Sequence, residues 1–355
     1  MVQREGERYY SLDFLKIVAT VIIICHHFQQ LSGAFYPGYI NFYNGKFYWG
    51  YMVELFFVLS GFFMYPYIEK IRGGGMGFAA FIYKRAGRLL PLMGISAVGY
   101  EILLPIYQRF FENSWWGGQM PDIWGTLTTM LGIQTMGIFT MPGINNPTWY
   151  ISILLLCYIV FFFLVIMSKR MEISCIYLFI MTILIGCSAT TMQMELPFLN
   201  LCCAKGYYTF FTGVLLAIWV NKVGVTNKAV AASVGSIGAF FFFACNHMEY
   251  ITNGQSYILT FIVYPSLIVI FKTGFVERLF HSKAWEIWGK ISYNCFVWHI
   301  PVFMLFNIVV KKYNLNISIS NISTMLLFVL ITECVGILSY CFLEKGIFRL
   351  CVKMK

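Results

Sequence analysis

The sequence predicts an all-α protein, a polytopic transmembrane bundle of about ten spanning helices plus a re-entrant or interfacial segment. Three observations predict this class: 59% of the 355 residues are hydrophobic, only 11% are charged, and apolar runs recur along the whole chain. Soluble domains usually carry about a quarter charged residues, so one globular core cannot bury this much apolar surface. Each run is long enough to cross a hydrocarbon layer about 30 Å thick.

Short polar loops separate the ten expected spans. These spans cover residues 12–32, 47–68, 89–107, 148–168, 174–191, 205–221, 229–246, 256–272, 291–310 and 322–343. The first span is long and lacks the small-residue cleavage pattern of a signal peptide, so we expect it to be retained. Segment 123–141 is interrupted by Gly125, Gly132 and Gly137. We expect it to be re-entrant or interfacial, since non-helical backbone at membrane depth must be surrounded by protein or water.

Lysine and arginine are distributed unequally between the two sides of the predicted bundle. Of the 25 basic residues, nineteen fall on the side of the two termini, five on the opposite side, and Lys16 lies within the first span. By the positive-inside rule, this asymmetry predicts a multi-pass protein of the cell (plasma) membrane with both termini cytoplasmic. The net charge of +10 therefore reflects topology, and no nucleic-acid partner is expected.

The positions of the cysteines indicate that they are packing residues of the helices. Most of the eleven cysteines lie inside apolar runs, without the paired spacing of a metal site. We expect them to be reduced, and we expect no metal ion and no permanently bound cofactor.

Ionisable residues inside predicted spans are candidate functional residues, because each costs a few kcal/mol to insert. Lys16 and His27 are eleven residues apart, which places them on nearly one helix face and about 16 Å apart in depth. Glu54 lies at the depth of His27 in the second span. A carboxylate beside a histidine makes the imidazole a general base, so His27 and Glu54 are predicted to be catalytic. The alternative interpretation is a structural buried ion pair.

A second candidate group precedes the third span. The three-residue spacing of Arg85 and Arg88 places both on one helix face. Paired guanidinium groups suit phosphate, such as the phosphates of coenzyme A. Basic residues at a span end also follow topology or contact anionic lipid, and this interpretation stays open.

Four further side chains are expected to line a cavity shared with these candidate groups. They are Ser60, Trp149, Tyr293 and His299. Trp149 opens the fourth span, where anchoring at the membrane interface is the simpler interpretation. His299 lies mid-membrane near Pro301, and a core histidine bonded to a neighbouring backbone is an equal alternative.

These residues make the chain resemble the acyltransferase 3 family of membrane acyltransferases, which modify bacterial glycans. Four blocks carry the resemblance over nearly the whole chain: Lys16 with His27, Glu54 to Gly61, Arg85 with Arg88, and Gly289 to His299. Two departures are visible. Lys16 stands where arginine is commonest, and Gly346 stands where a proline usually follows Leu343-Glu344-Lys345.

The resemblance implies one integral membrane acyltransferase domain over residues 1–355. It implies that acyl-CoA, with acetyl-CoA the expected form, enters as co-substrate from the cytoplasm, where Lys16, Arg85 and Arg88 bind it. The acyl group would go to a hydroxyl of a cell-surface or secreted polysaccharide or its lipid-linked precursor. His27 would either deprotonate the acceptor or carry the acyl group. Any onward transfer would need a separate extracytoplasmic transferase as partner.

Two other classes of function compete with this interpretation. Ten helices with intramembrane lysine, histidine and glutamate also describe a proton-coupled transporter or flippase, although a pair of repeated, broken helices is not evident from the sequence. A relative that lost activity and serves as a sensor or assembly subunit is less consistent with the retained His27 and Glu54.

Overall fold

The computed structural model describes residues 9–111, 119–139, 144–246 and 254–346, and over these ranges the chain forms helices and no strands. The predicted all-α class is therefore confirmed for the described residues. Within them, seven helices are long and apolar enough to span a membrane. They are α1 (Tyr10–Ser32), α4 (Phe78–Phe111), α6 (Trp149–Arg170), α8 (Leu201–Val223), α9 (Asn227–Asn246), α14 (Lys283–Lys312) and α15 (Ile322–Ser339).

The predicted count of about ten spans is not confirmed. One predicted span is a bent pair, α2 (Met52–Phe62) and α3 (Tyr65–Arg72), with an angle of 41° between the two helices. Two others are shorter apolar helices. These are α7 (Cys175–Thr191) and a run made of α11 (Gln255–Ile258), the π-helical turn η4 (Leu259–Val263) and α12 (Tyr264–Phe271).

Prolines mark two of these irregularities. Pro66 lies in the first turn of α3 and Pro265 in the first turn of α12. Proline cannot donate the backbone hydrogen bond that continues a helix, so Pro66 follows the bend between α2 and α3, and Pro265 follows the π-helical turn η4 in a run that stays helical.

The segment expected to be re-entrant or interfacial contains only a short helix, α5 (Ile123–Leu131). Nine residues rise about 14 Å, less than half of the hydrocarbon thickness. The helix ends at Gly132, whose φ is 71°, a conformation that favours glycine. Residues 140 and 141 of the expected segment lie outside the described residues. The helical part of this segment does not span a bilayer.

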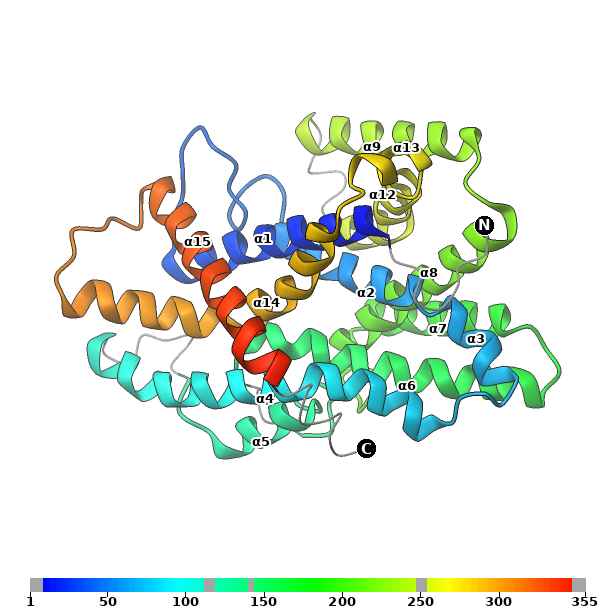
Figure 1. Ribbon diagram of the computed structural model, residues 1–355, viewed down its shortest axis with the longest axis horizontal. Coiled ribbons are helices and arrows are strands. Elements are labelled where there is room, and N and C mark those ends of the chain that lie inside the picture. Colours follow the sequence, from blue (N-terminus) through cyan, green and yellow to red (C-terminus); the bar gives the residue numbers. More distant parts are fainter. Residues whose placement is uncertain (1–8, 112–118, 140–143, 247–253, 347–355) are drawn as a thin grey trace.

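The remaining short elements connect the helices. They are η1 (Trp49–Tyr51), η2 (Asn146–Thr148), α13 (Gly274–Leu279) and η5 (Tyr340–Glu344). Figure 1 shows α1 and α14 side by side through the molecule, with α15 and α4 packed on α14. On the other side of α1, α2 packs on α8, and α8 packs on α6 and α7. The candidate site residues lie mainly on α1, α2, α4 and α14.

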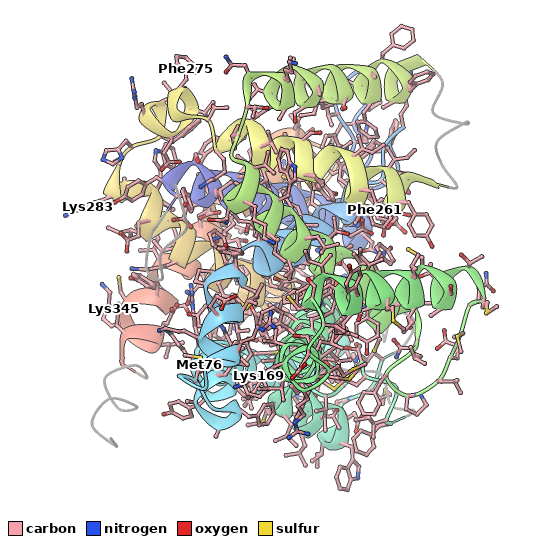
Figure 2. All side chains as sticks on the ribbon, turned by 90° about the vertical axis from the view of Figure 1, so that its right-hand side faces the viewer. Met76, Lys169, Phe261, Phe275, Lys283 and Lys345 are labelled. Carbon is pink, nitrogen blue, oxygen red and sulfur yellow. The ribbon has the colours of Figure 1, made fainter. Side chains whose placement is uncertain are left out.

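One end of the molecule collects basic residues. The last turn of α3 carries Lys70 and Arg72, and the last turn of α6 carries Lys169 and Arg170. Both helices end at the right-hand side of Figure 1, and Figure 2, which looks onto that side, labels Lys169 there. These basic ends share one side of the bundle, as the positive-inside interpretation requires.

Large apolar side chains cover much of the outer surface. Phe261, which is 41% exposed, points away from the bundle in Figure 2, and Leu184 and Phe342 are exposed in the same way. Soluble monomers rarely expose so many apolar groups, whereas a bilayer solvates them. The helices α6 and α8 are mostly buried, while α9 and α15 are mostly exposed. This pattern is typical of an integral membrane protein.

The helices α2 and α8 cross in backbone contact. A Cβ atom added at Gly61 would overlap the carbonyl oxygen of Phe210, and one added at Gly213 would overlap that of Val58. Glycine at both positions therefore permits the crossing, as small residues commonly do between membrane helices. The contact places the polar residues of α2 against α8.

Candidate active site

Five helices enclose a cavity of about 360 Å³, a size typical of small-molecule sites. The walls come from α1, α2, α4, α6 and α14. Its charged lining consists of Lys16, Lys84, Arg85, Arg88 and Asp13. Of the site residues predicted from sequence, the cavity brings together Lys16, Ser60, Arg85, Arg88 and Tyr293. The cavity therefore joins residues that are more than 270 positions apart in the chain.

The two arginines of α4 form the basic end of the cavity. The Cζ atom of Arg85 lies 4.3 Å from the ring centroid of Tyr67, and its buried Nε atom has no hydrogen-bond partner among the described residues. Arg88 is exposed. Neither guanidinium forms an ion pair with another described residue. Both arginines therefore retain hydrogen-bonding capacity for an anionic ligand.

Lys16 is held at the cavity wall by Asp13. Its Nζ atom lies 3.1 Å from Asp13 Oδ1 and 4.5 Å from the ring centroid of Phe63. Asp13 is buried against α14, where a Cβ atom at Gly289 would stand only 2.9 Å from the Asp13 Cβ atom. The sequence analysis missed Asp13. The three-residue spacing from Lys16, which brings two side chains together on a helix, was the available signal.

Three aromatic residues, Phe56, Tyr150 and Phe296, form an aromatic cluster that lines the other end of the cavity. Their ring centroids are 5.9, 6.2 and 5.8 Å apart, so each ring contacts the other two. The Ser60 hydroxyl lies 3.3 Å from the Tyr150 hydroxyl. Phe296 also packs against His299, with ring centroids 5.8 Å apart. Phe296 therefore connects the cavity to the histidine.

His27 of α1 and His299 of α14 contact each other. His27 Nδ1 lies 3.1 Å from His299 Nε2, and the ring centroids are 4.9 Å apart. His299 Nδ1 lies 2.6 Å from the carbonyl oxygen of Phe296. His299 is fully buried, whereas His27 is partly exposed. Neither histidine is part of the cavity lining, and Phe296 contacts both the cavity and His299.

A proline and an asparagine shape α14 beside His299. Pro301 has no N–H, so the carbonyl oxygen of Val297, four residues earlier, lacks its helical donor. Asn145 supplies one instead, since its Nδ2 atom donates to this oxygen over 3.0 Å. Asn145 is fully buried with a φ of 52°, a conformation that asparagine adopts more readily than most residues. The sequence analysis named Pro301 but not the role of Asn145, which only the fold brings close.

Glu54 is fully buried, and its side chain bonds to residues other than His27. Its Oε1 atom lies 3.3 Å from Lys205 Nζ and accepts a hydrogen bond of 2.6 Å from Ser256, while Oε2 accepts one of 3.2 Å from Thr260. No hydrogen bond joins Glu54 to His27 in the part of the chain that the structure describes. The expected His27–Glu54 pair is therefore not formed. Glu54 instead ties α2 to α8, α11 and η4, through residues that sequence reasoning missed.

The two remaining predicted residues differ in position. The Tyr293 hydroxyl donates to the carbonyl oxygen of Leu89 over 2.5 Å at the cavity wall. Trp149 does not line the cavity and packs on Phe57, with ring centroids 6.0 Å apart. Among the described residues, no group of three or more histidine, cysteine, aspartate and glutamate side chains is placed to hold a metal ion.

The membrane-type helical bundle, its basic cavity and the adjoining histidine pair together define an integral membrane protein with an enzyme-like site. A family model described as "Acyltransferase domain" matches residues 9–341, nearly the whole chain. The chain belongs to the acyltransferase 3 family, and this confirms the resemblance seen in the sequence. Comparisons with curated proteins and with solved structures found no match. Membership of the family supports acyl transfer as the activity.

Proposed function

We propose that the protein transfers an acyl group, in the first instance acetyl, from acyl-CoA to a hydroxyl of a cell-surface or secreted polysaccharide or its lipid-linked precursor. The cavity is the observation that carries the proposal. Its basic end presents guanidinium groups that no carboxylate neutralises in the described chain, and its aromatic end reaches the His27–His299 pair through Phe296. One cavity thus offers positive charge for an anionic donor and adjoins histidines that can accept a proton.

The donor binds at the basic end. Arg85 and Arg88 hold phosphate groups of coenzyme A, because guanidinium forks make strong charge-assisted hydrogen bonds to phosphate. Lys16, positioned by Asp13, adds a positive charge on the opposite wall. The distribution of basic residues supports a cytoplasmic location for this end and for both termini, in the cell (plasma) membrane.

The acceptor reacts at His27. As general base, His27 removes the proton of the acceptor hydroxyl while the oxygen attacks the thioester carbonyl. The new ester C–O bond forms, the C–S bond breaks, and the proton passes to the departing thiolate of coenzyme A. Glu54 supports this chemistry from the next helix by holding Lys205 and η4 in place.

The remaining roles follow from this chemistry. The activated thioester arrives with the donor, so the reaction requires neither a metal ion nor a permanently bound cofactor. Tyr293 and Ser60 shape the cavity wall. A separate extracytoplasmic transferase is the proposed partner for any onward transfer of the acyl group.

A proton-coupled transporter is the competing function. Two observations favour it: the bend between α2 and α3, and the π-helical turn η4 between α11 and α12. Transporters use such discontinuous helices to line a central substrate site. The basic cavity has no evident use in a proton pathway, however, and this favours the acyltransferase.

Binding of the donor tests the proposal. The wild-type protein in nanodiscs would be titrated with acetyl-CoA, free coenzyme A and ATP, alongside the Arg85→Ala/Arg88→Ala double variant. The control is Lys169→Ala/Arg170→Ala, which removes two basic residues from the end of α6, outside the cavity. We expect acetyl-CoA to bind, the cavity variant to bind at least tenfold more weakly, and the control to bind normally. A folded wild type that binds no acetyl-CoA would overturn the proposal in favour of transport.

A further inference from the structure

We infer that His299 is a positioning residue that fixes the tautomer of His27, so that His27 Nε2 is the atom that receives the acceptor proton. The inference rests on the proposed function in one respect, namely that the proton comes from the hydroxyl of the acceptor. Its structural part, the tautomer of His27, stands on the contacts of the two imidazole rings.

The first step concerns His299. Its Nδ1 atom lies 2.6 Å from the Phe296 carbonyl oxygen, and a carbonyl oxygen can only accept a hydrogen bond. Nδ1 therefore carries a proton. His299 is fully buried, and its hydrogen-bond partners among the described residues are the backbone carbonyls of Phe296 and Cys295 and another imidazole, with no carboxylate. A buried charge without a counter-ion is costly, so the ring is neutral and its Nε2 atom bears a lone pair.

The second step concerns His27. Its Nδ1 atom lies 3.1 Å from that lone pair on His299 Nε2, so His27 Nδ1 must be the donor. A neutral imidazole carries one N–H, and Nε2 of His27 is then unprotonated and basic. The two hydrogen bonds run from His27 through His299 to the backbone of α14.

Besides His299, the His27 ring has a hydrogen-bond contact with the backbone carbonyl oxygen of Ile23, which can only accept and so also favours an N–H on the ring. The neighbouring side chains of the described residues are engaged elsewhere. The ring of His26 is 5.2 Å away, centroid to centroid, but its Nδ1 atom is committed to the Phe42 carbonyl oxygen. Glu54 is occupied by Lys205, Ser256 and Thr260. His299 therefore takes the orienting position that the sequence analysis gave to Glu54.

The arrangement also suits the charged stage of the reaction. When Nε2 of His27 takes the acceptor proton, the ring becomes an imidazolium, and Nδ1–H still donates to the lone pair of His299. A hydrogen bond from an ionised donor is stronger than a neutral one. His299 thus stabilises the protonated His27, as the third member of a catalytic triad does, although here it is neutral.

Two matched variants separate positioning from packing. In His299→Gln the amide oxygen reaches the position of Nε2 and can accept from His27. In His299→Asn the shorter amide reaches only the position of Nδ1, so it can keep the contact with Phe296 and loses the one with His27. Both substitutes are uncharged, polar and similar in volume.

The first measurement is the tautomer itself. The chain has five histidines, so imidazole ¹⁵N spectra of labelled protein in nanodiscs are simple, and a His27→Gln variant assigns the His27 signals. We expect His27 protonated on Nδ1 in the wild type and in His299→Gln, and a shift toward the Nε2-protonated form in His299→Asn. Protonation of wild-type His27 on Nε2 would overturn the inference, whatever the activity.

The second measurement is acetyl-CoA cleavage, followed as released thiol with water as acceptor. We expect His299→Asn to lower kcat by about 100-fold or more and His299→Gln by less than about tenfold, with KM for acetyl-CoA unchanged in both. Equal kcat values in the two variants would overturn the positioning role. A folded wild type that cleaves no acetyl-CoA would instead count against the proposed function, and the spectra would still decide the tautomer.

Discussion

Lys205 Nζ lies 3.3 Å from Glu54 Oε1, which makes a partly exposed lysine of α8 the counter-ion of a fully buried carboxylate of α2. Ser256 and Thr260 complete the hydrogen bonds of this carboxylate from a third segment of the chain. The pair therefore joins three parts of the bundle inside the membrane region, where an unpaired charge is costly.

Breaking this pair should destabilise the fold. Lys205→Met leaves Glu54 buried without a cation, and we expect the free energy of unfolding to fall by about 3 kcal/mol, the low end for a buried pair because Lys205 is partly exposed. Glu54→Gln should cost less, since the amide still bonds to Ser256 and Thr260. Unfolding in mixed detergent would measure both. The control is Lys290→Ala, which breaks a pair with Glu286 in which both partners are partly exposed, and it should cost under about 1 kcal/mol. Equal losses in Lys205→Met and Lys290→Ala would contradict the role of Glu54.

Phe296 should limit the length of the acyl group. Its ring lines the cavity and packs on His299, so Phe296→Leu should widen the end of the cavity next to the histidine pair. We expect the ratio of kcat/KM for butyryl-CoA to that for acetyl-CoA to rise at least tenfold. Phe303→Leu is the matched control, because Phe303 lies on the same helix but packs on Phe28 and Phe328 outside the cavity. The same change of ratio in both variants would remove Phe296 as a determinant of chain length.

Asn145 and Pro301 should be energetically coupled. Asn145→Ala leaves the Val297 carbonyl without its donor, and we expect a loss of about 1–3 kcal/mol in stability. In a Pro301→Ala background the new N–H of residue 301 can bond to Val297, so Asn145→Ala should cost less there. A double-mutant cycle on unfolding free energies measures the difference. Additive losses would show that Asn145 acts elsewhere.

Asp13 should act on donor binding through Lys16. Asp13→Asn removes the ion pair that holds Lys16 Nζ at the cavity wall, so we expect KM for acetyl-CoA to rise about three- to tenfold while kcat stays within about twofold. Lys16→Met should raise KM further, because it removes the charge itself. Steady-state kinetics in nanodiscs would establish the order. A fall of kcat in Asp13→Asn with an unchanged KM would place Asp13 in the chemical step instead.

Helical periodicity predicted which residues share a face, and this part of the site could be derived from sequence. The spacing of Arg85 and Arg88 predicted a shared helix face, the family resemblance added Lys16 to the donor site, and the cavity contains all three. Depth along a helix axis is likewise readable from a count of residues. Direction around the axis relative to other helices is not, because it depends on packing. Glu54 was therefore expected at the depth of His27, but its side chain faces Lys205.

Contacts between distant segments account for the rest of what sequence reasoning missed. Lys205 was counted only as a basic residue on the outer side, and Ser256 and Thr260 carried no pattern at all. The pairing of His27 with His299 joins positions 272 residues apart. His299 was recognised because an ionisable group in a span is costly, but its partner was decided by the packing of α1 on α14.

The glycine crossing of α2 and α8 has a mechanical consequence. Since Gly61 and Gly213 leave no gap between the two backbones, these helices can neither approach nor slide without a clash. The pair should move as one rigid body, carrying Phe56 on the cavity side and the Glu54–Lys205 ion pair with it. Any widening needed for an acyl group to pass from the cavity to His27 must then come from displacement of α1, α4, α6 or α14 against this fixed wall.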